Sequence, residues 1–150
     1  MKKKPKILIV KSSYNATFNL YESAFEELDR RKIYYECIRV NGAFEIPVTI
    51  ARNINKFDAF IAIGIIIKGK TPNFDFISQA ITNGLMELSI LHKKPIGNAI
   101  LTCLNSDQAE ERSHKGKEAV EAVLDVLNPN ADLKASKEQK KIFSFIRKIK

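Results

Sequence analysis

The chain has 150 residues, of which 45% are hydrophobic and 28% charged, and its formal net charge at pH 7 is +8. This composition predicts one folded domain rather than a disordered chain, and no apolar run approaches the ~20 residues of a membrane-spanning helix. The positive excess belongs to the two ends, since residues 1–6 carry four Lys and residues 134–150 carry six Lys, one Arg and one Glu. Because the charge lies at the ends and not on a binding face, we expect neither a nucleic-acid nor a membrane partner. The apolar residues near the start, Ile7 to Val10, are too few for a signal-peptide core, so we expect a cytoplasmic protein.

Short β-branched runs alternate along the chain with longer segments of 3.6-residue periodicity. This order predicts an α/β fold in which a parallel four-stranded sheet has helices on both faces. Pro47 can open a short helix, because its missing N–H is not needed in a first turn. In chain order we expect a strand at 6–10, a helix at 19–31, a strand at 34–40, a helix at 47–56, a strand at 58–67, a helix at 74–92, a strand at 95–102 and a helix at 107–127.

The same periodicity predicts which side chains are buried. Cys37 and Cys103 stand among apolar residues, and because the sequence has no CxxC or His/Cys cluster we expect two buried reduced thiols and no metal site. The helical side chains expected to face the sheet are Leu20, Ala24, Phe25, Leu28, Ile77, Ala80, Ile81, Leu85, Leu88 and Leu91.

The chain divides into an expected domain at 1–133 and a basic tail at 134–150. Four apolar residues of the tail recur at helical spacing between Lys and Arg residues, which predicts a short amphipathic helix. Such a helix would dock on this protein or a neighbouring subunit, fray, or contact an acidic membrane surface. The apolar positions are Ile142, Phe145, Ile146 and Ile149.

Residues 64–71 read GIIIKGKT, which satisfies the P-loop pattern G-x-x-x-x-G-K-[ST]. A P-loop needs a flexible turn, whereas three consecutive Ile residues extend a strand, and no Walker-B-type strand follows. We therefore exclude a nucleotide-hydrolysing site. The second half of this octet places Gly69, Lys70 and Thr71 before a helix start near Pro72. It is either an anion-binding site or an ordinary strand-to-helix turn.

The loops that follow the four expected strands contain SSYN, VNGAFEIP, KGKTPNFD and QAEER, and ligands of parallel sheets bind at this edge. In this order, over residues 6–127, the motifs resemble those of the lumazine synthase family. The resemblance implies a flavodoxin-like three-layer sandwich without a cofactor, in pentamers or pentamer-based shells whose active sites are shared between subunits. It also implies condensation of 5-amino-6-(ribitylamino)uracil with 3,4-dihydroxy-2-butanone 4-phosphate.

The resemblance assigns a role to each matching residue. Tyr14, with Asn15 beside it, would stack on the pyrimidine, although Tyr14 can equally be a packing residue. Lys70 and Thr71 would seat the phosphate. Arg112 would clamp the anion from the next subunit, unless it forms an ordinary surface ion pair. Ala43, Phe44 and Glu45 would hold the ribityl-pyrimidine, unless Glu45 is a plain surface charge. The backbone groups of Ile65, Ile66 and Ile67 would bind the pyrimidine edge.

Three positions depart from the family pattern. Asn41 replaces a Pro in a turn, and Asn98 stands where the family often has an aromatic residue from the adjacent subunit. Asn73 occupies the position of the His credited with proton transfer, and an amide cannot act as acid or base near neutral pH. His114 is a candidate replacement, and His92 is expected far away. We therefore expect an enzyme that works mainly by positioning its reactants, or else a weak or inactive paralogue that binds lumazine or flavin or forms a shell. A flavodoxin-like FMN carrier is a further alternative.

Overall fold

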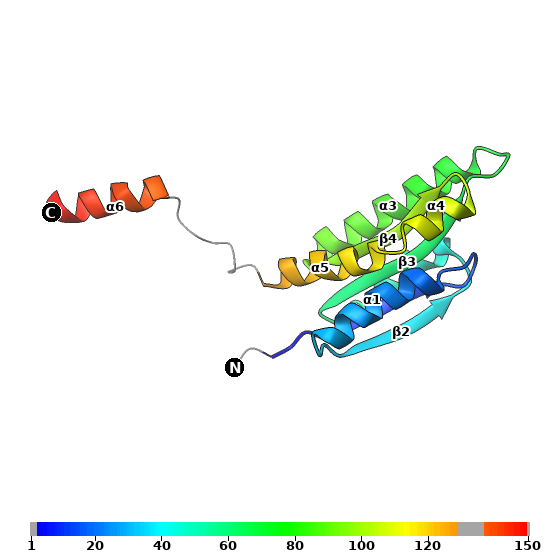
Figure 1. The fold of residues 1–150 in the computed structure, drawn as a ribbon, viewed down its shortest axis with the longest axis horizontal. Helices are drawn as coiled ribbons and strands as arrows, with labels where there is room; N and C mark the ends of the chain where they lie inside the picture. The colour runs from blue at the N-terminus through cyan, green and yellow to red at the C-terminus, as the bar shows by residue number, and fades with distance from the viewer. Residues whose placement is uncertain (1–2, 129–136, 150) are drawn as a thin grey trace.

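Four parallel strands form the sheet at the centre of the chain, which the computed structural model describes at residues 3–128 and 137–149 (Figure 1). The strand order is β2-β1-β3-β4. The two inner strands are buried on both faces, as their unbroken apolar sequences predict. The parallel four-stranded sheet is therefore confirmed. Its strands are β1 (Ile7–Ser12), β2 (Tyr35–Val40), β3 (Ala59–Ile67) and β4 (Ile96–Cys103).

Helices cover both faces of the sheet and complete the predicted three-layer sandwich (Figure 1). Side chains of α1, α4 and α5 pack on one face, and side chains of η1, α2 and α3 pack on the other. On the described chain, α6 follows as a separate helix. The bounds are α1 (Phe18–Arg30), η1 (Ala43–Glu45), α2 (Ile46–Arg52), α3 (Asn73–His92), α4 (Ser106–Glu111), α5 (Lys115–Leu127) and α6 (Lys137–Ile149).

The expected single helix at 107–127 is wrong, because α4 and α5 are separated by residues 112–114. Ser23 of α1 lies at the break, where its hydroxyl donates to the Ser113 carbonyl (2.6 Å) and accepts from the Lys117 N–H (3.1 Å). Gly116 contacts α1 so closely that an added Cβ would lie 2.1 Å from the Leu20 carbonyl oxygen. Packing against α1 therefore overrides the helical periodicity of the sequence.

Several burial predictions also fail, while the core positions of α1 and α3 such as Leu20 and Ile81 are confirmed. Ala80 and Leu91 are exposed on the outer side of α3, which no other described element covers. Cys37 is exposed on the edge strand β2, whereas Cys103 is buried as expected. The predicted helix at 47–56 ends at Arg52, and the next residues form turns.

One buried carboxylate is neutralised inside α1. Glu27 is 4% exposed and accepts hydrogen bonds from the guanidinium groups of Arg30 and Arg31. The hydrogen bonds from Arg30, and then those from Arg31, lower the pKa of Glu27 to about 2 against the opposing effect of burial. The cluster fixes the last turns of α1.

The expected amphipathic tail helix is present as α6, and its apolar side chains are exposed. The expected boundary between residues 133 and 134 lies outside the described residues. None of the helices in the described part of the chain combines the length and apolar character needed to cross a membrane.

Candidate active site

A cavity of about 520 Å³ opens at the carboxyl edge of the sheet, where three strand ends meet the first turn of α3. This is the edge at which parallel α/β sheets bind ligands. Most of the residues predicted for the site line it. The lining residues are Tyr14, Asn15, Gly42, Ala43, Phe44, Ile65, Ile66, Ile67, Lys68, Gly69, Thr71, Asn73, Phe74 and Ile77.

The loop after β1 is tied to both neighbouring strands. The Tyr14 N–H donates to the Asn41 carbonyl (2.8 Å), which joins this loop to the one after β2. Asn15 adopts a left-handed backbone (φ 67°), and its side-chain amide donates to the Ile65 carbonyl at the end of β3 (2.8 Å). These bonds hold the Tyr14 ring at the cavity while 73% of the residue stays exposed. An exposed ring in this position is available for stacking on a flat ligand.

The loop after β2 forms the short helix η1 against β3. Ala43 is buried there, and Gly64 of β3 allows the close approach, because a Cβ on Gly64 would lie 3.3 Å from the Ala43 Cβ. The Phe44 ring stays exposed and lines the cavity. Glu45 does not line it, since its carboxylate accepts from the Gly42 N–H (3.2 Å) and closes the turn. In this structure Glu45 therefore supports the loop.

The segment 64–71 is the end of a strand followed by a turn, as the sequence predicts. Residues 64–67 belong to β3, so Gly64 takes no part in a phosphate-cradling turn. The Thr71 hydroxyl accepts from the Asn73 N–H (3.4 Å), which places it over the start of the 20-residue helix α3. Thr71 lines the cavity, whereas Lys70 is exposed outside its lining. The positive end of the α3 dipole and the Thr71 hydroxyl make this border favourable for an anion.

Asn73 is the first residue of α3 and lines the cavity with its side chain exposed. Among the described lining residues, the side chains of Tyr14 and Lys68 are the titratable ones. The described part of the chain also holds no group of three His, Cys, Asp or Glu residues that could bind a metal ion. The cavity can thus orient ligands and bind an anion, and it has no histidine or carboxylate on its wall.

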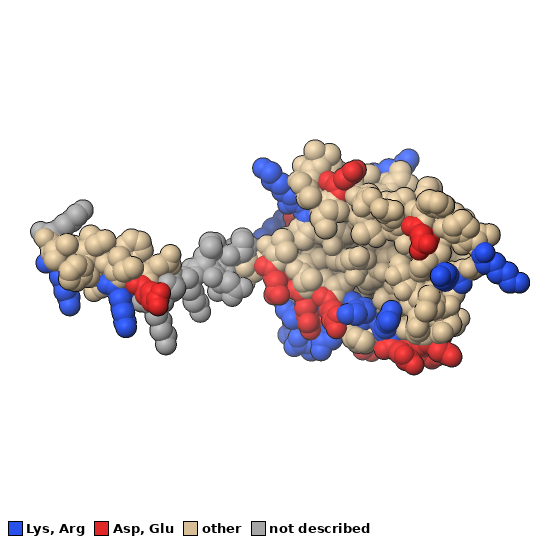
Figure 2. All heavy atoms as spheres, turned by 90° about the horizontal axis from the view of Figure 1, so that it is seen from above, with Lys and Arg blue, Asp and Glu red and all other residues tan. Residues whose placement is uncertain are grey.

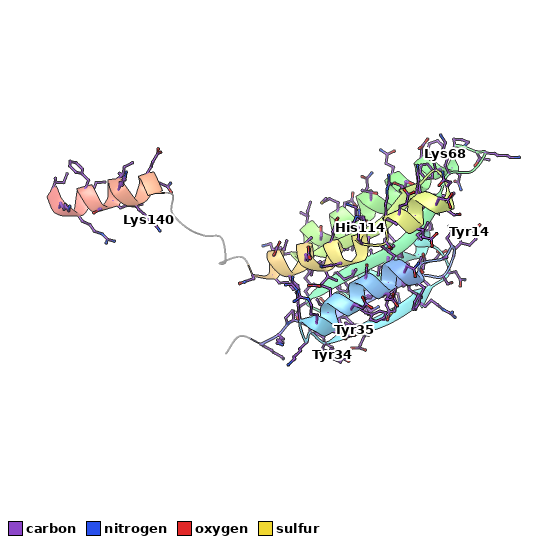
Figure 3. The ribbon with its side chains drawn as sticks, in the orientation of Figure 1. Tyr14, Tyr34, Tyr35, Lys68, His114 and Lys140 are labelled. Atoms are coloured by element: carbon purple, nitrogen blue, oxygen red, sulfur yellow. The ribbon has the colours of Figure 1, made fainter. Side chains whose placement is uncertain are left out.

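Two predicted residues lie away from the cavity of their own subunit. Asn98 sits on β4 opposite Ala62 and borders a separate groove between α3 and α5. Arg112 directly follows α4 as its C-cap residue and is absent from the cavity lining. His114, just before α5, is also outside the cavity lining, and its Nε2 lies 3.5 Å from the Glu118 carboxylate. Figure 3 shows His114 apart from Tyr14 and Lys68. His92 is exposed at the far end of α3.

Several lining residues were missed by the sequence reasoning, among them Gly42, Lys68, Phe74 and Ile77. Lys68 is anchored by its N–H to the Cys103 carbonyl (2.9 Å) and lines the cavity just before Gly69. Figure 3 labels it in the loop after β3. Its position beside the glycine turn was the available signal. Phe74 and Ile77 lie one helical turn apart on the cavity side of α3, and their spacing alone does not separate a core face from a cavity wall.

The sequence matches one protein family over most of its length. The family described as 6,7-dimethyl-8-ribityllumazine synthase matches residues 4–130. A protein of that name from Cutibacterium acnes (strain DSM 16379 / KPA171202) is 44% identical over 97 residues, which cover 60% of this chain and 58% of that protein. The chain thus covers less than two thirds of this relative.

Other relatives of the same name match over longer stretches. The protein from Bartonella tribocorum (strain CIP 105476 / IBS 506) is 36% identical over 134 residues, covering 83% of this chain and 89% of that protein. The protein from Campylobacter curvus (strain 525.92) is 35% identical over 137 residues, covering 83% of this chain and 88% of that protein.

Proposed function

Since the chain belongs to the 6,7-dimethyl-8-ribityllumazine synthase family, we propose that it makes this lumazine in riboflavin biosynthesis. The substrates are 5-amino-6-(ribitylamino)uracil and 3,4-dihydroxy-2-butanone 4-phosphate, and the products are the lumazine, phosphate and water. The observation that carries the proposal is the single cavity that joins Tyr14, the end of β3, Thr71 and Asn73.

The pyrimidine binds between the exposed Tyr14 ring and the end of β3. Stacking on an aromatic face and backbone hydrogen bonds to the ring edge together fix its orientation. Ile67 offers these backbone groups, because the Ile65 carbonyl on the same side of β3 is already occupied by the Asn15 amide and the Ile66 backbone faces its partner Thr102 on β4. The ribityl chain lies toward Ala43 and Phe44, with Glu45 holding the loop that carries them.

The phosphate of the second substrate binds at the start of α3. The Thr71 hydroxyl, the helix dipole and the nearby charges of Lys68 and Lys70 favour an anion there. Arg112 of a neighbouring subunit adds a planar guanidinium clamp. With both substrates bound, the amine attacks the ketone, and the addition product loses water to form an imine. Phosphate is then eliminated, and ring closure releases a second water.

Positioning supplies most of the rate, because Asn73 cannot exchange protons. Aligning two reactants can contribute about 7–11 kcal/mol, whereas general acid–base help is typically worth ~10² to 10⁴ in rate. Asn73 orients groups by hydrogen bonds, and water carries the protons. We therefore expect turnover above the spontaneous reaction but slower than a site with a base would give.

The active unit in this proposal is a homo-oligomer, a pentamer or a pentamer-based shell, in the cytoplasm. Asn98 and Arg112 lie outside the cavity of their own subunit, and a neighbour is needed to bring them to one. The exposed apolar side chains of α3, among them Phe76, Ile90 and Leu91, also suit a subunit contact. Light scattering gives the molar mass, and a monomer at working concentrations would contradict the shared site. We further propose residues 1–133 as the enzyme domain and 134–150 as an appended tail.

The test is to mix the purified protein with both substrates and follow the absorbance of the lumazine. Product formation faster than the spontaneous reaction supports the enzyme. Asn73 also makes a binding or shell-forming paralogue the second candidate. Ligand binding measured by calorimetry without any gain in product formation would establish that candidate instead.

A further inference from the structure

The helix α6 presents two opposite faces of different chemistry. At about 100° per residue, its five apolar side chains fall within an arc of roughly 160°. Four basic side chains, Lys140, Lys141, Arg147 and Lys148, fall on the opposite side. Figure 2 shows the Lys and Arg side chains of α6 gathered along one side, and Figure 3 shows where Lys140 leaves the helix. The apolar set is Ile142, Phe143, Phe145, Ile146 and Ile149.

The apolar face is exposed to solvent in the single chain. Its five side chains are between 40% and 68% exposed, and two of them are Phe. Helix α6 also lies outside residues 4–130, which match the enzyme family. Neither the core nor the family therefore accounts for this apolar face.

A second groove of the domain is a poor docking site for this apolar face on electrostatic grounds. The groove, about 740 Å³ between α3, β4 and α5, carries Lys93, Lys94 and Lys115. Its one acidic residue, Glu118, is paired with Lys115 (2.8 Å), and the positive charge that remains is that of Lys93 and of Lys94, whose ammonium donates to the Ile54 carbonyl (2.6 Å). Because basic side chains border the apolar face of α6, docking there would bring like charges together.

An anionic lipid surface satisfies both faces at once. Acyl chains take up Ile and Phe side chains, while anionic headgroups attract Lys and Arg. A nucleic acid would use the basic face alone and leave the Phe residues in water. With 13 residues, α6 is about 20 Å long and too short to span the hydrocarbon core of about 30 Å, so it lies along the surface.

We propose that α6 binds the full chain to membrane surfaces rich in anionic phospholipids. Of the three outcomes expected for the tail helix, this selects contact with an acidic membrane surface, against the expectation that the protein as a whole has no membrane partner. The proposal holds whether or not the chain makes lumazine. Basic residues near an anionic surface each contribute about fivefold to binding, so the four on α6 contribute several-hundred-fold in total, roughly. Salt should weaken the attraction by screening.

The test is flotation of the full chain with vesicles of phosphatidylcholine alone or mixed with phosphatidylglycerol. We expect binding to the mixed vesicles, roughly several-hundred-fold weaker for K140Q/K141Q/R147Q/K148Q and at least about tenfold weaker for F143S/F145S. The matched control K140R/K141R/K148R keeps the charge and should bind like the unmodified chain. Because these side chains are exposed, the unfolding temperature should not change in any variant.

Several results would overturn the proposal. These are no binding to mixed vesicles, equal binding to neutral ones, or unchanged binding by either the Gln or the Ser variant. Light scattering of F143S/F145S tests whether a second copy of the chain covers the apolar face instead of lipid. If the unmodified chain does not bind vesicles and the variant has a lower molar mass, the face belongs to a second copy. If the chain does not bind vesicles but binds RNA, and F143S/F145S binds RNA equally well, the basic face belongs to nucleic acid.

Discussion

Asn73→His should accelerate turnover if the missing base limits the rate. Asn73 is exposed at the cavity, so an imidazole can be placed there without disturbing the core, and we expect stability to change by less than about 0.5 kcal/mol. The backbone N–H that donates to the Thr71 hydroxyl is retained in the variant. The substitution therefore tests proton transfer rather than folding.

The expected gain in kcat is about 10²-fold, the lower end of general acid–base catalysis, because water already carries part of the proton transfer. This corresponds to about 2.7 kcal/mol of activation free energy. The positive end of α3 disfavours the imidazolium and keeps the imidazole neutral near pH 7. The kcat of the variant should decrease as the pH is lowered below the pKa of that imidazole. The pH profile of the parent protein should not show this decrease.

The assay is lumazine absorbance under saturating substrates across a pH series, with Asn73→Gln as the matched control. Gln keeps an amide and cannot exchange protons, so we expect no gain from it. An unchanged or lower kcat for Asn73→His, with substrate binding intact, would refute the reasoning. It would mean that the site has been retuned around the amide.

Three further predictions rest on single contacts. Arg112→Ala should weaken inhibition by inorganic phosphate at least about tenfold if a neighbour's guanidinium clamps the anion, and unchanged inhibition would refute its role. Asn15→Gly keeps the left-handed backbone but loses the amide donated to Ile65, so kcat/KM should fall about 3- to 10-fold, and an unaltered value would show that the bond is not needed. Glu27→Gln should cost about 1 kcal/mol at pH 7, a figure reduced because the partner arginines are exposed to solvent. Because the pKa of Glu27 is lowered from 4.5 to about 2, its contribution is full above pH 4.5 and lost toward pH 2, so thermal unfolding of the Gln variant should depend less on pH in that window.

The sheet could be predicted because its inner strands carry unbroken β-branched sequences between turn residues. The same Ile residues that rule out a P-loop form the end of β3, and the cavity opens where that strand stops. Tyr14, Phe44 and Thr71 could be placed together because parallel strands bring the loops after them to one edge.

What could not be predicted depends on contacts far apart in the sequence. The break between α4 and α5 follows from Ser23 and Gly116, whose meeting no local pattern reveals. Leu91 fits the buried period of α3 and yet is exposed, since no described element of one chain covers that side. Lys68 reaches the cavity through a backbone bond to β4, which only the assembled sheet provides.

The central claim is that this cavity condenses the two substrates by positioning them. The most direct measurement follows lumazine absorbance and inorganic phosphate in one reaction, with and without the protein. The account predicts one phosphate per lumazine, at a rate well above the spontaneous reaction. Equal rates with and without the protein, while it still binds the pyrimidine substrate, would contradict it.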